Sequence, residues 1–193
     1  MKKEEIAEDF KEKAELSNAD LDYFFQKAEF TSLQKNEHLI RTGDQKVHFV
    51  LIQSGCLMTY FKDQSEHVHA IQFGQEMWWT GDLDAIFNKH PSNYAIKALT
   101  PAEVYLLNKE NFEDLNQHHP VFESYFRKLF QNALISHQKR IIRNISYTAE
   151  EKYLEFVKLH PRLELIVPQK YIASYMGITP EFLSKLKRKL AQS

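Results

Sequence analysis

The sequence lacks what several large classes of protein require. Its single cysteine, Cys56, excludes an internal disulfide framework, a cysteine-based zinc finger and a four-cysteine iron–sulfur cluster. No stretch approaches the roughly 18 uninterrupted apolar residues of a transmembrane helix, and the charged N-terminus has no apolar segment typical of a signal peptide. The formal net charge of -1 gives no overall basic field, so affinity for nucleic acid requires a local cluster of charge. A cytoplasmic protein without membrane partners is expected.

The sequence has enough apolar material for a folded core, since 43% of its residues are hydrophobic. Residues 29–108 form short apolar or alternating runs separated by turn sequences, which predicts an antiparallel β sandwich or barrel. The preceding segment and the whole C-terminal part show helical patterns. The predicted class is therefore α+β, with a β-rich domain over residues 1–119, a long helix over 120–145 and a small helical domain over 146–193.

The helix predicted over 120–145 has an apolar arc wide enough for two neighbours. At 100° per residue its apolar side chains fall within roughly 140°, more than a surface helix with a single neighbour requires. A rise of about 1.5 Å per residue gives roughly 37 Å, enough to lie along the β domain and along a second copy. The residues assigned to this dimer contact are Phe122, Phe126, Leu129 and Ala133. The alternative is a helix that packs only on its own β domain.

The segment 169–190 predicts two short helices joined by a tight turn. Gly177 lies where a turn between crossing helices needs a positive φ. Thr179, Pro180 and Glu181 then give the second helix an N-cap, a proline at the first helical position and an acidic first turn. This pattern is typical of a helix-turn-helix, whose second helix enters the major groove of DNA.

The second helix of this hairpin divides into an apolar and a polar face. The predicted inward face is Phe182, Leu183, Leu186 and Leu190. The outward face is Glu181, Ser184, Lys185 and Arg188, and such lysine, glutamate and serine groups can read base edges. Five basic residues against one acidic residue from position 169 onward suit a phosphate backbone, with Lys187 and Lys189 as further phosphate contacts. The alternative is an ordinary solvated helix face.

Nearly the whole chain resembles the Crp/Fnr family of bacterial transcription regulators, especially the short form common in the Bacteroidetes. The resemblance rests on VPQKYIASYMGITPEFLSKLKRKL in the hairpin, YTAEEKYLEFVKLHP in the helix before it and RTGDQKVHFVLIQSGCLMTYFKD in the β domain. It implies a cyclic-nucleotide-binding-like β-roll, also called a double-stranded β-helix, then a dimerisation helix and a helix-turn-helix without a clear wing. It also implies a non-enzymatic homodimer on palindromic double-stranded DNA, with RNA polymerase as a further candidate partner.

The resemblance assigns base contacts to the first turn and a half of the second hairpin helix and a phosphate contact to the start of the first. Their positive charge adds Lys170 and Arg188 as further DNA contacts. The predicted DNA interface is Gln169, Lys170, Thr179, Pro180, Glu181, Ser184, Lys185 and Arg188.

The segment WWTGDLDAIFNKHPSNYAIKAL resembles the phosphate-binding cassette of cyclic-nucleotide receptors. The candidate effector pocket is Gly81, Asp82, Leu83, Ser92 and Asn93. The receptors place an arginine on the cyclic phosphate where this chain has Ser92, and losing such a charge-assisted contact removes roughly 1.5 to 3 kcal/mol of binding free energy. A cyclic nucleotide is therefore disfavoured as the effector, and an unknown small molecule or no effector is expected. The missing cysteines likewise disfavour the iron–sulfur subtype.

Two other functions stay open. His67 and His69 lie two apart on a predicted strand, so both side chains point to one face and could hold a metal, as in cupin enzymes built on a similar β-roll. No persuasive second histidine motif accompanies them, so no metal site is predicted. The other alternative is a scaffold that binds a partner protein and no DNA.

Overall fold

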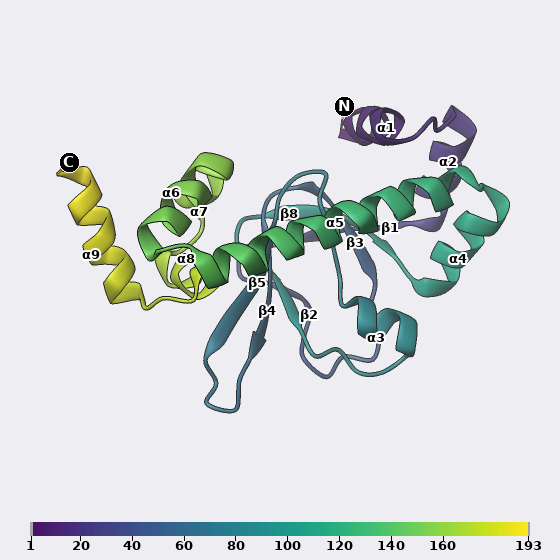
Figure 1. Cartoon of the computed structure of the whole chain (residues 1–193). Helices are drawn as coiled ribbons and strands as arrows, with labels where there is room; N and C mark the ends of the chain where they lie inside the picture. The colour runs from purple at the N-terminus through teal and green to yellow at the C-terminus, as the bar shows by residue number, and fades with distance from the viewer. Residues whose placement is uncertain (1, 193) are drawn as a thin grey trace.

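The computed structural model describes residues 2–192, and Figure 1 shows a long helix running across a β-rich body toward a group of C-terminal helices. The strands are β1 (Glu29–Leu33), β2 (His38–Ile40), β3 (Phe49–Ser54), β4 (Leu57–Lys62), β5 (Val68–Gly74), β6 (Trp79–Thr80), β7 (Ala95–Ala98) and β8 (Ala102–Leu107). The helices are α1 (Lys2–Lys13), α2 (Asn18–Lys27), α3 (Leu83–Asn88), α4 (Lys109–His118), α5 (Val121–Ser146), α6 (Ala149–Leu159), α7 (Pro161–Ile166), α8 (Gln169–Met176) and α9 (Pro180–Ala191).

The strands form two four-stranded sheets, in the orders β1-β8-β3-β6 and β2-β7-β4-β5. Each pairing in these sheets is antiparallel. Sequence neighbours β3 and β4 lie in different sheets, so the chain passes repeatedly from one sheet to the other. This arrangement confirms the predicted α+β class with an antiparallel β domain followed by helices.

Apolar side chains from both sheets meet in the interior of the β domain. Val50 and Val104 come from one sheet, and Leu57 and Ile96 come from the other; all four are fully buried in one cluster. Alternation along each strand brings these side chains to the same face, as the period of two requires. Burying each such side chain contributes about 1.5 to 3 kcal/mol to folding.

A second, aromatic cluster joins the outside of the β domain to α1, α2, α4 and the start of α5. Phe10 of α1 lies at its centre, with its ring centroid 5.0 Å from that of Phe24 and 4.7 Å from that of Tyr125. The Trp79 indole N–H donates a hydrogen bond of 2.9 Å to the Tyr125 hydroxyl. The N-terminal helices therefore fix the first half of α5 onto the β domain.

The long helix α5 spans 26 residues and ends at Ser146, close to the predicted range of 120–145. The next helix begins where the sequence places a capping box: the Thr148 side chain accepts from the Glu151 backbone, and the Glu151 carboxylate accepts from the Thr148 backbone. Among the described residues, none of the helices combines the length and the apolar character that crossing a lipid bilayer requires.

The C-terminal helices dock on β5, the outer strand of its sheet. The Ser174 hydroxyl of α8 donates to the Val68 carbonyl at 2.7 Å and accepts from the Ala70 N–H at 3.0 Å. Arg140 of α5 donates to the carbonyls of Ala70 and Ile71. Two helices thus satisfy outward backbone groups of an edge strand and fix the hairpin against the β domain.

Candidate nucleic-acid interface and effector cassette

The turn between α8 and α9 has the local structure that its sequence predicts. Gly177 has φ 70° and ψ 33°, in the left-handed region. A Cβ at this position would meet open space, so backbone conformation, and not crowding, favours glycine there. The Thr179 side chain then caps α9 by accepting a hydrogen bond of 3.2 Å from the Phe182 N–H, and Pro180 follows at the first helical position.

Helix α9 buries a narrow face and exposes the rest. Leu183 is fully buried and Leu186 is 7% exposed, in one cluster with residues of α6 and α8. The predicted DNA contacts at its start and along its outward face, Thr179, Pro180, Glu181, Ser184, Lys185 and Arg188, are all exposed. Phe182, predicted to pack inward, is instead 51% exposed. It stands on the flank of α9, outside the narrow stripe that α8 covers.

Two lysines assigned to DNA phosphates are held within the domain. The Lys187 amine lies 2.5 Å from a Glu164 carboxylate oxygen and 5.8 Å from the Tyr153 ring centroid. Burial acts to lower the pKa of Lys187, but the hydrogen bonds and charges of Glu164 and Tyr153 together outweigh it and the pKa rises. Lys189 pairs with Glu150 at 2.9 Å. In the free chain Lys187 is therefore a packing contact, because a carboxylate of the same domain neutralises it.

Lys185 and the start of α8 stay available to a ligand. Within residues 2–192, the Lys185 amine forms no hydrogen bond or ion pair. Gln169 and Lys170 are exposed in the first turn of α8, with the Lys170 amine 5.0 Å from the Tyr171 ring centroid. The structure thus gathers all the predicted DNA-contacting residues on the exposed start of α8 and the outward side of α9.

The predicted effector residues surround the short helix α3, whose N-cap is Asp82. Asp82 is 1% exposed, and its carboxylate accepts hydrogen bonds from the Ala85 N–H at 3.2 Å and the Asn93 N–H at 2.9 Å. The same carboxylate accepts from the Ser92 hydroxyl at 3.0 Å, and Ser92 is 2% exposed. Donors from both ends of the cassette therefore converge on a carboxylate of the chain itself.

Gly81 and Leu83 lie on either side of Asp82 and differ in their surroundings. Gly81 has φ 154°, and a Cβ there would lie 2.8 Å from the His48 carbonyl oxygen, so the close approach of the two backbones requires glycine. Leu83 is 43% exposed. The structure brings Gly81, Asp82, Ser92 and Asn93 together through their own hydrogen bonds and backbone contacts, and it leaves the Leu83 side chain partly in solvent.

The structure corrects the assignment of Phe122 and Phe126 to a dimer contact. Phe122 is fully buried and Phe126 is 2% exposed, both inside the aromatic cluster of their own chain. Leu129 is partly buried against the same cluster, and only Ala133 is exposed. The periodicity correctly indicated an apolar face, but α1, α2 and α4 cover the first half of it. The large exposed apolar residues of α5 lie further along: Leu134, Ile135, Ile141, Ile142 and Ile145.

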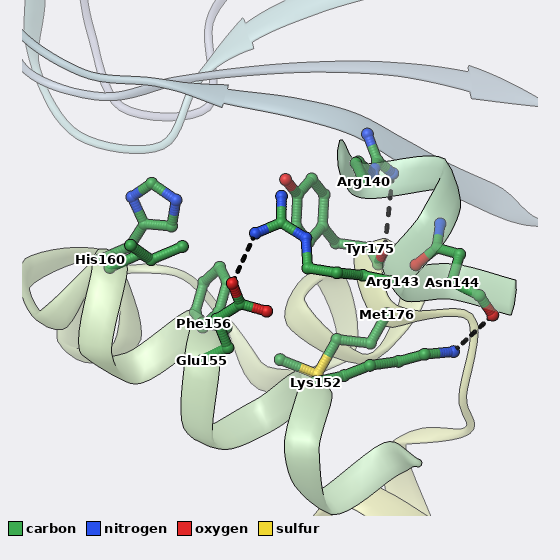
Figure 2. A pocket seen from close by; sticks show the side chains of 10 residues that line it. Arg140, Arg143, Asn144, Lys152, Glu155, Phe156, His160, Tyr175 and Met176 are labelled. Atoms are coloured by element: carbon green, nitrogen blue, oxygen red, sulfur yellow. Dashed lines mark hydrogen bonds and ion pairs between the residues drawn. The ribbon is translucent and has the colours of Figure 1, made fainter. Parts of the chain in front are cut away.

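A group of charged residues that the sequence did not reveal lies where α5, α6 and α8 meet (Figure 2). The Arg140 guanidinium stacks 4.0 Å from the Tyr175 ring centroid, and burial lowers its pKa. Arg143 pairs with Glu155 at 2.9 Å, and Lys152 donates to a backbone carbonyl of α5 at 3.0 Å. These three cations contact other residues of the same chain, and their contacts join α5 to α6 and α8. The members of this group come from separate helices, and no local pattern marks them.

The histidines considered as metal ligands are bound to a nearby aspartate. The His69 ring lies 2.8 Å from an Asp63 carboxylate oxygen, and the His67 ring lies 3.6 Å from the other. In the part of the chain that the structure describes, no group of three or more histidine, cysteine, aspartate or glutamate side chains is arranged to hold a metal ion. Only His69 lies on β5, since His67 precedes the strand, and the cupin-type alternative gains no support from these two histidines.

Comparison with known proteins assigns the β domain. The protein-family model of the cyclic nucleotide-binding domain matches residues 30–119. The Anaerobic regulatory protein of Aggregatibacter actinomycetemcomitans is 26% identical over 168 residues, an alignment that covers 80% of this chain and 63% of that protein. The chain thus spans less than two thirds of the length of this relative.

Solved structures share the fold over most of both chains. The c-di-GMP-responsive global regulator CLP of Xanthomonas campestris superposes with a TM-score of 0.76 at 11% identity, covering 91% of this chain and 92% of that one. A regulator of the crp/fnr family from Eubacterium rectale superposes with a TM-score of 0.72 at 14% identity, covering 92% and 84%. Residues 30–119 thus match the cyclic nucleotide-binding domain, and the chain as a whole shares the fold of these solved regulators.

Proposed function

We propose that this protein is a transcription regulator of the Crp/Fnr type that binds a palindromic operator as a homodimer, with α9 in the major groove and the start of α8 on the phosphates. The outward face of α9 is the observation that supports this most: Lys185 is exposed and unpaired within residues 2–192, beside exposed Glu181 and Ser184. A lysine can donate to guanine O6 and N7, and a glutamate can accept from cytosine N4. In a two-fold dimer the half-sites lie about 34 Å apart, one turn of DNA.

The dimer contact is proposed on the second half of α5. Its exposed apolar side chains include Leu134 at 61%, Ile142 at 60% and Ile145 at 81% exposure. A contiguous apolar surface of this kind marks an interaction site, and a two-fold axis lets two copies cover each other with the same stripe. Of the residues first assigned to this contact, Ala133 stays at its edge, while Phe122 and Phe126 do not take part.

The proposed input is a small molecule other than a cyclic nucleotide, or no effector at all. The arginine position of the cassette holds Ser92, whose hydroxyl is bound to the Asp82 carboxylate. A cyclic phosphate in the same place would meet a buried negative charge without a neutralising guanidinium, which disfavours it. The proposed role involves no chemical step; the protein would act in the cytoplasm, with RNA polymerase as its further partner.

Selection of genomic DNA fragments by the purified protein tests this function. The wild type should enrich a palindrome, and Lys185→Ala should lower the affinity for it by about 1 to 3 kcal/mol while relaxing the preference at one position of each half-site. Lys35→Ala, an exposed lysine of the β domain, is the matched control and should leave binding unchanged. Failure of the wild type to enrich any palindrome would instead favour the protein-binding scaffold.

Sedimentation of Ile142→Glu tests the dimer separately. A charge within the exposed stripe of α5 should shift the protein to a monomer, since burying an unpaired carboxylate is unfavourable. A dimer that persists in this variant would place the contact elsewhere.

A further inference from the structure

The recognition helix carries an exposed aromatic side chain that the polar contacts leave without a role. Phe182 is 51% exposed, while its neighbour Leu183 is fully buried. Its backbone is fixed by the Thr179 cap, which accepts the Phe182 N–H at 3.2 Å. The ring is therefore presented from the first turn of α9, where recognition helices contact bases.

Phe182 shares a stripe of α9 with two lysines. Phe182, Lys185 and Lys189 stand at positions i, i+3 and i+7, which face the same way on an α-helix. Lys185, the unpaired base-reading candidate, lies one turn further from the start of the helix. A ligand that meets Lys185 from the helix start therefore also meets the Phe182 ring.

The surface beside this stripe is a groove between α6 and α9. It is lined by Thr148, Ala149, Glu150, Glu151, Leu154, Phe182, Lys185, Leu186 and Lys189. Leu154 is 50% exposed, so both walls of the groove are partly apolar. Its lining holds as many carboxylates as lysines, so its net charge does not decide the occupant; the unpaired Lys185 and the continuity with the proposed DNA-binding face favour DNA over an apolar protein partner.

We propose that Phe182 is a specificity-determining residue that recognises thymine through its C5-methyl group in the major groove. Apolar contact is the means by which phenylalanine distinguishes thymine, since the methyl group is the one apolar feature on a major-groove base edge. The preferred half-site then contains a thymine adjacent to the position read by Lys185. This inference rests on the proposed DNA-binding function and adds a named base to it.

Uracil substitution in the selected operator tests the contact, because uracil lacks only the methyl group. For the wild type, replacing the thymine in one half-site should weaken binding about fourfold, the equivalent of one buried methylene. Phe182→Ala should bind both operators equally and lose the thymine preference in a repeated selection. Phe182→Leu should keep part of the preference, and Leu165→Ala, which changes an exposed apolar residue of α7 outside this groove, should keep all of it.

The outcomes separate this inference from the function on which it rests. A wild type that selects no palindrome contradicts both. A wild type that selects one but binds the uracil operator equally well contradicts the thymine contact alone. A uniform loss of affinity for all sequences in Phe182→Ala, with an unchanged melting temperature, would also overturn it by indicating a contact to the sugar–phosphate backbone.

Discussion

The cassette and the C-terminal hairpin each contain a helix that begins with a side-chain cap, but the two caps differ in which other groups they bind. Thr179 caps α9 with a hydroxyl and leaves the outward side chains of that helix in solvent. Asp82 caps α3 with a carboxylate that also binds Ser92 and Asn93, two of the other residues assigned to the candidate effector pocket. A helix cap therefore leaves polar side chains in solvent at one end of the molecule and binds polar groups of the chain itself at the other.

The difference follows from burial. Ser92 and Asp82 are almost completely removed from water, so their polar atoms need partners inside the chain. The outward groups of α9 are exposed to water in the free protein, so in the proposed complex they would exchange water for DNA. A polar cluster can bind a ligand only where its hydrogen-bond donors are unoccupied. In the cassette, the Ser92 hydroxyl and the Asn93 N–H already donate to Asp82.

Removal of the Asp82 carboxylate should have the largest effect. Asp82→Ala leaves three buried or partly buried donors without their acceptor and should lower the free energy of unfolding by about 3 kcal/mol. Urea denaturation measures the loss, with the exposed Asp22→Ala as control, expected within about 0.5 kcal/mol of wild type. An unchanged stability, or a rise in the wild-type melting temperature with cyclic AMP, would remove the contrast between the two regions.

Substitution of Lys187 sharpens the contrast within the hairpin itself. Lys187→Ala breaks a partly buried ion pair with Glu164 and should lower the free energy of unfolding by about 1 kcal/mol. The salt dependence of DNA binding should stay as in the wild type, whereas Lys185→Ala should change binding and leave stability within about 0.5 kcal/mol. If Lys187→Ala instead lowered the salt dependence with no loss of stability, the lysine would face DNA.

Titration of His160 should have the smallest effect on stability. This histidine follows α6 and lies where the C-terminal helices contact the β domain. Its ring packs 6.0 Å from that of Trp78 in the β domain, and burial, aided by the charge of Arg143, lowers its pKa below the ordinary 6.5. The unfolded state then binds the proton more readily, so stability is complete above about pH 6.5 and falls as the pH drops below it. His160→Gln should flatten this dependence in urea unfolding between about pH 7.5 and about pH 5.5, and an unchanged slope would contradict it.

Local rules account for what could be predicted from the sequence. Gly177, Thr179 and the Thr148 capping box each specify a conformation from a few adjacent residues, so the hairpin and its entry helix followed directly. The alternating runs between residues 29 and 108 likewise predicted the antiparallel sheets.

What could not be predicted depends on partners distant in the sequence. The partner of Lys187 is Glu164, on another helix, and Ser92 reaches Asp82 only after the cassette folds back on itself. The apolar face of α5 was recognised, but periodicity does not say whether Phe122 meets its own N-terminal helices or a second copy. The exposure of Phe182 likewise depends on the width of the surface that α8 offers.

The docking of α8 on β5 has a consequence for the solubility of the isolated β domain. Outer strands with open backbone groups template pairing with other chains, and here Ser174 and Arg140 occupy the carbonyls and the N–H that would do so. A fragment that ends before α8 would keep β5 while losing Ser174, and it should aggregate through that edge more readily than the whole chain. The C-terminal helices thereby also cover an edge strand, and any movement that lifts α8 from β5 would expose the backbone groups of that strand to other chains.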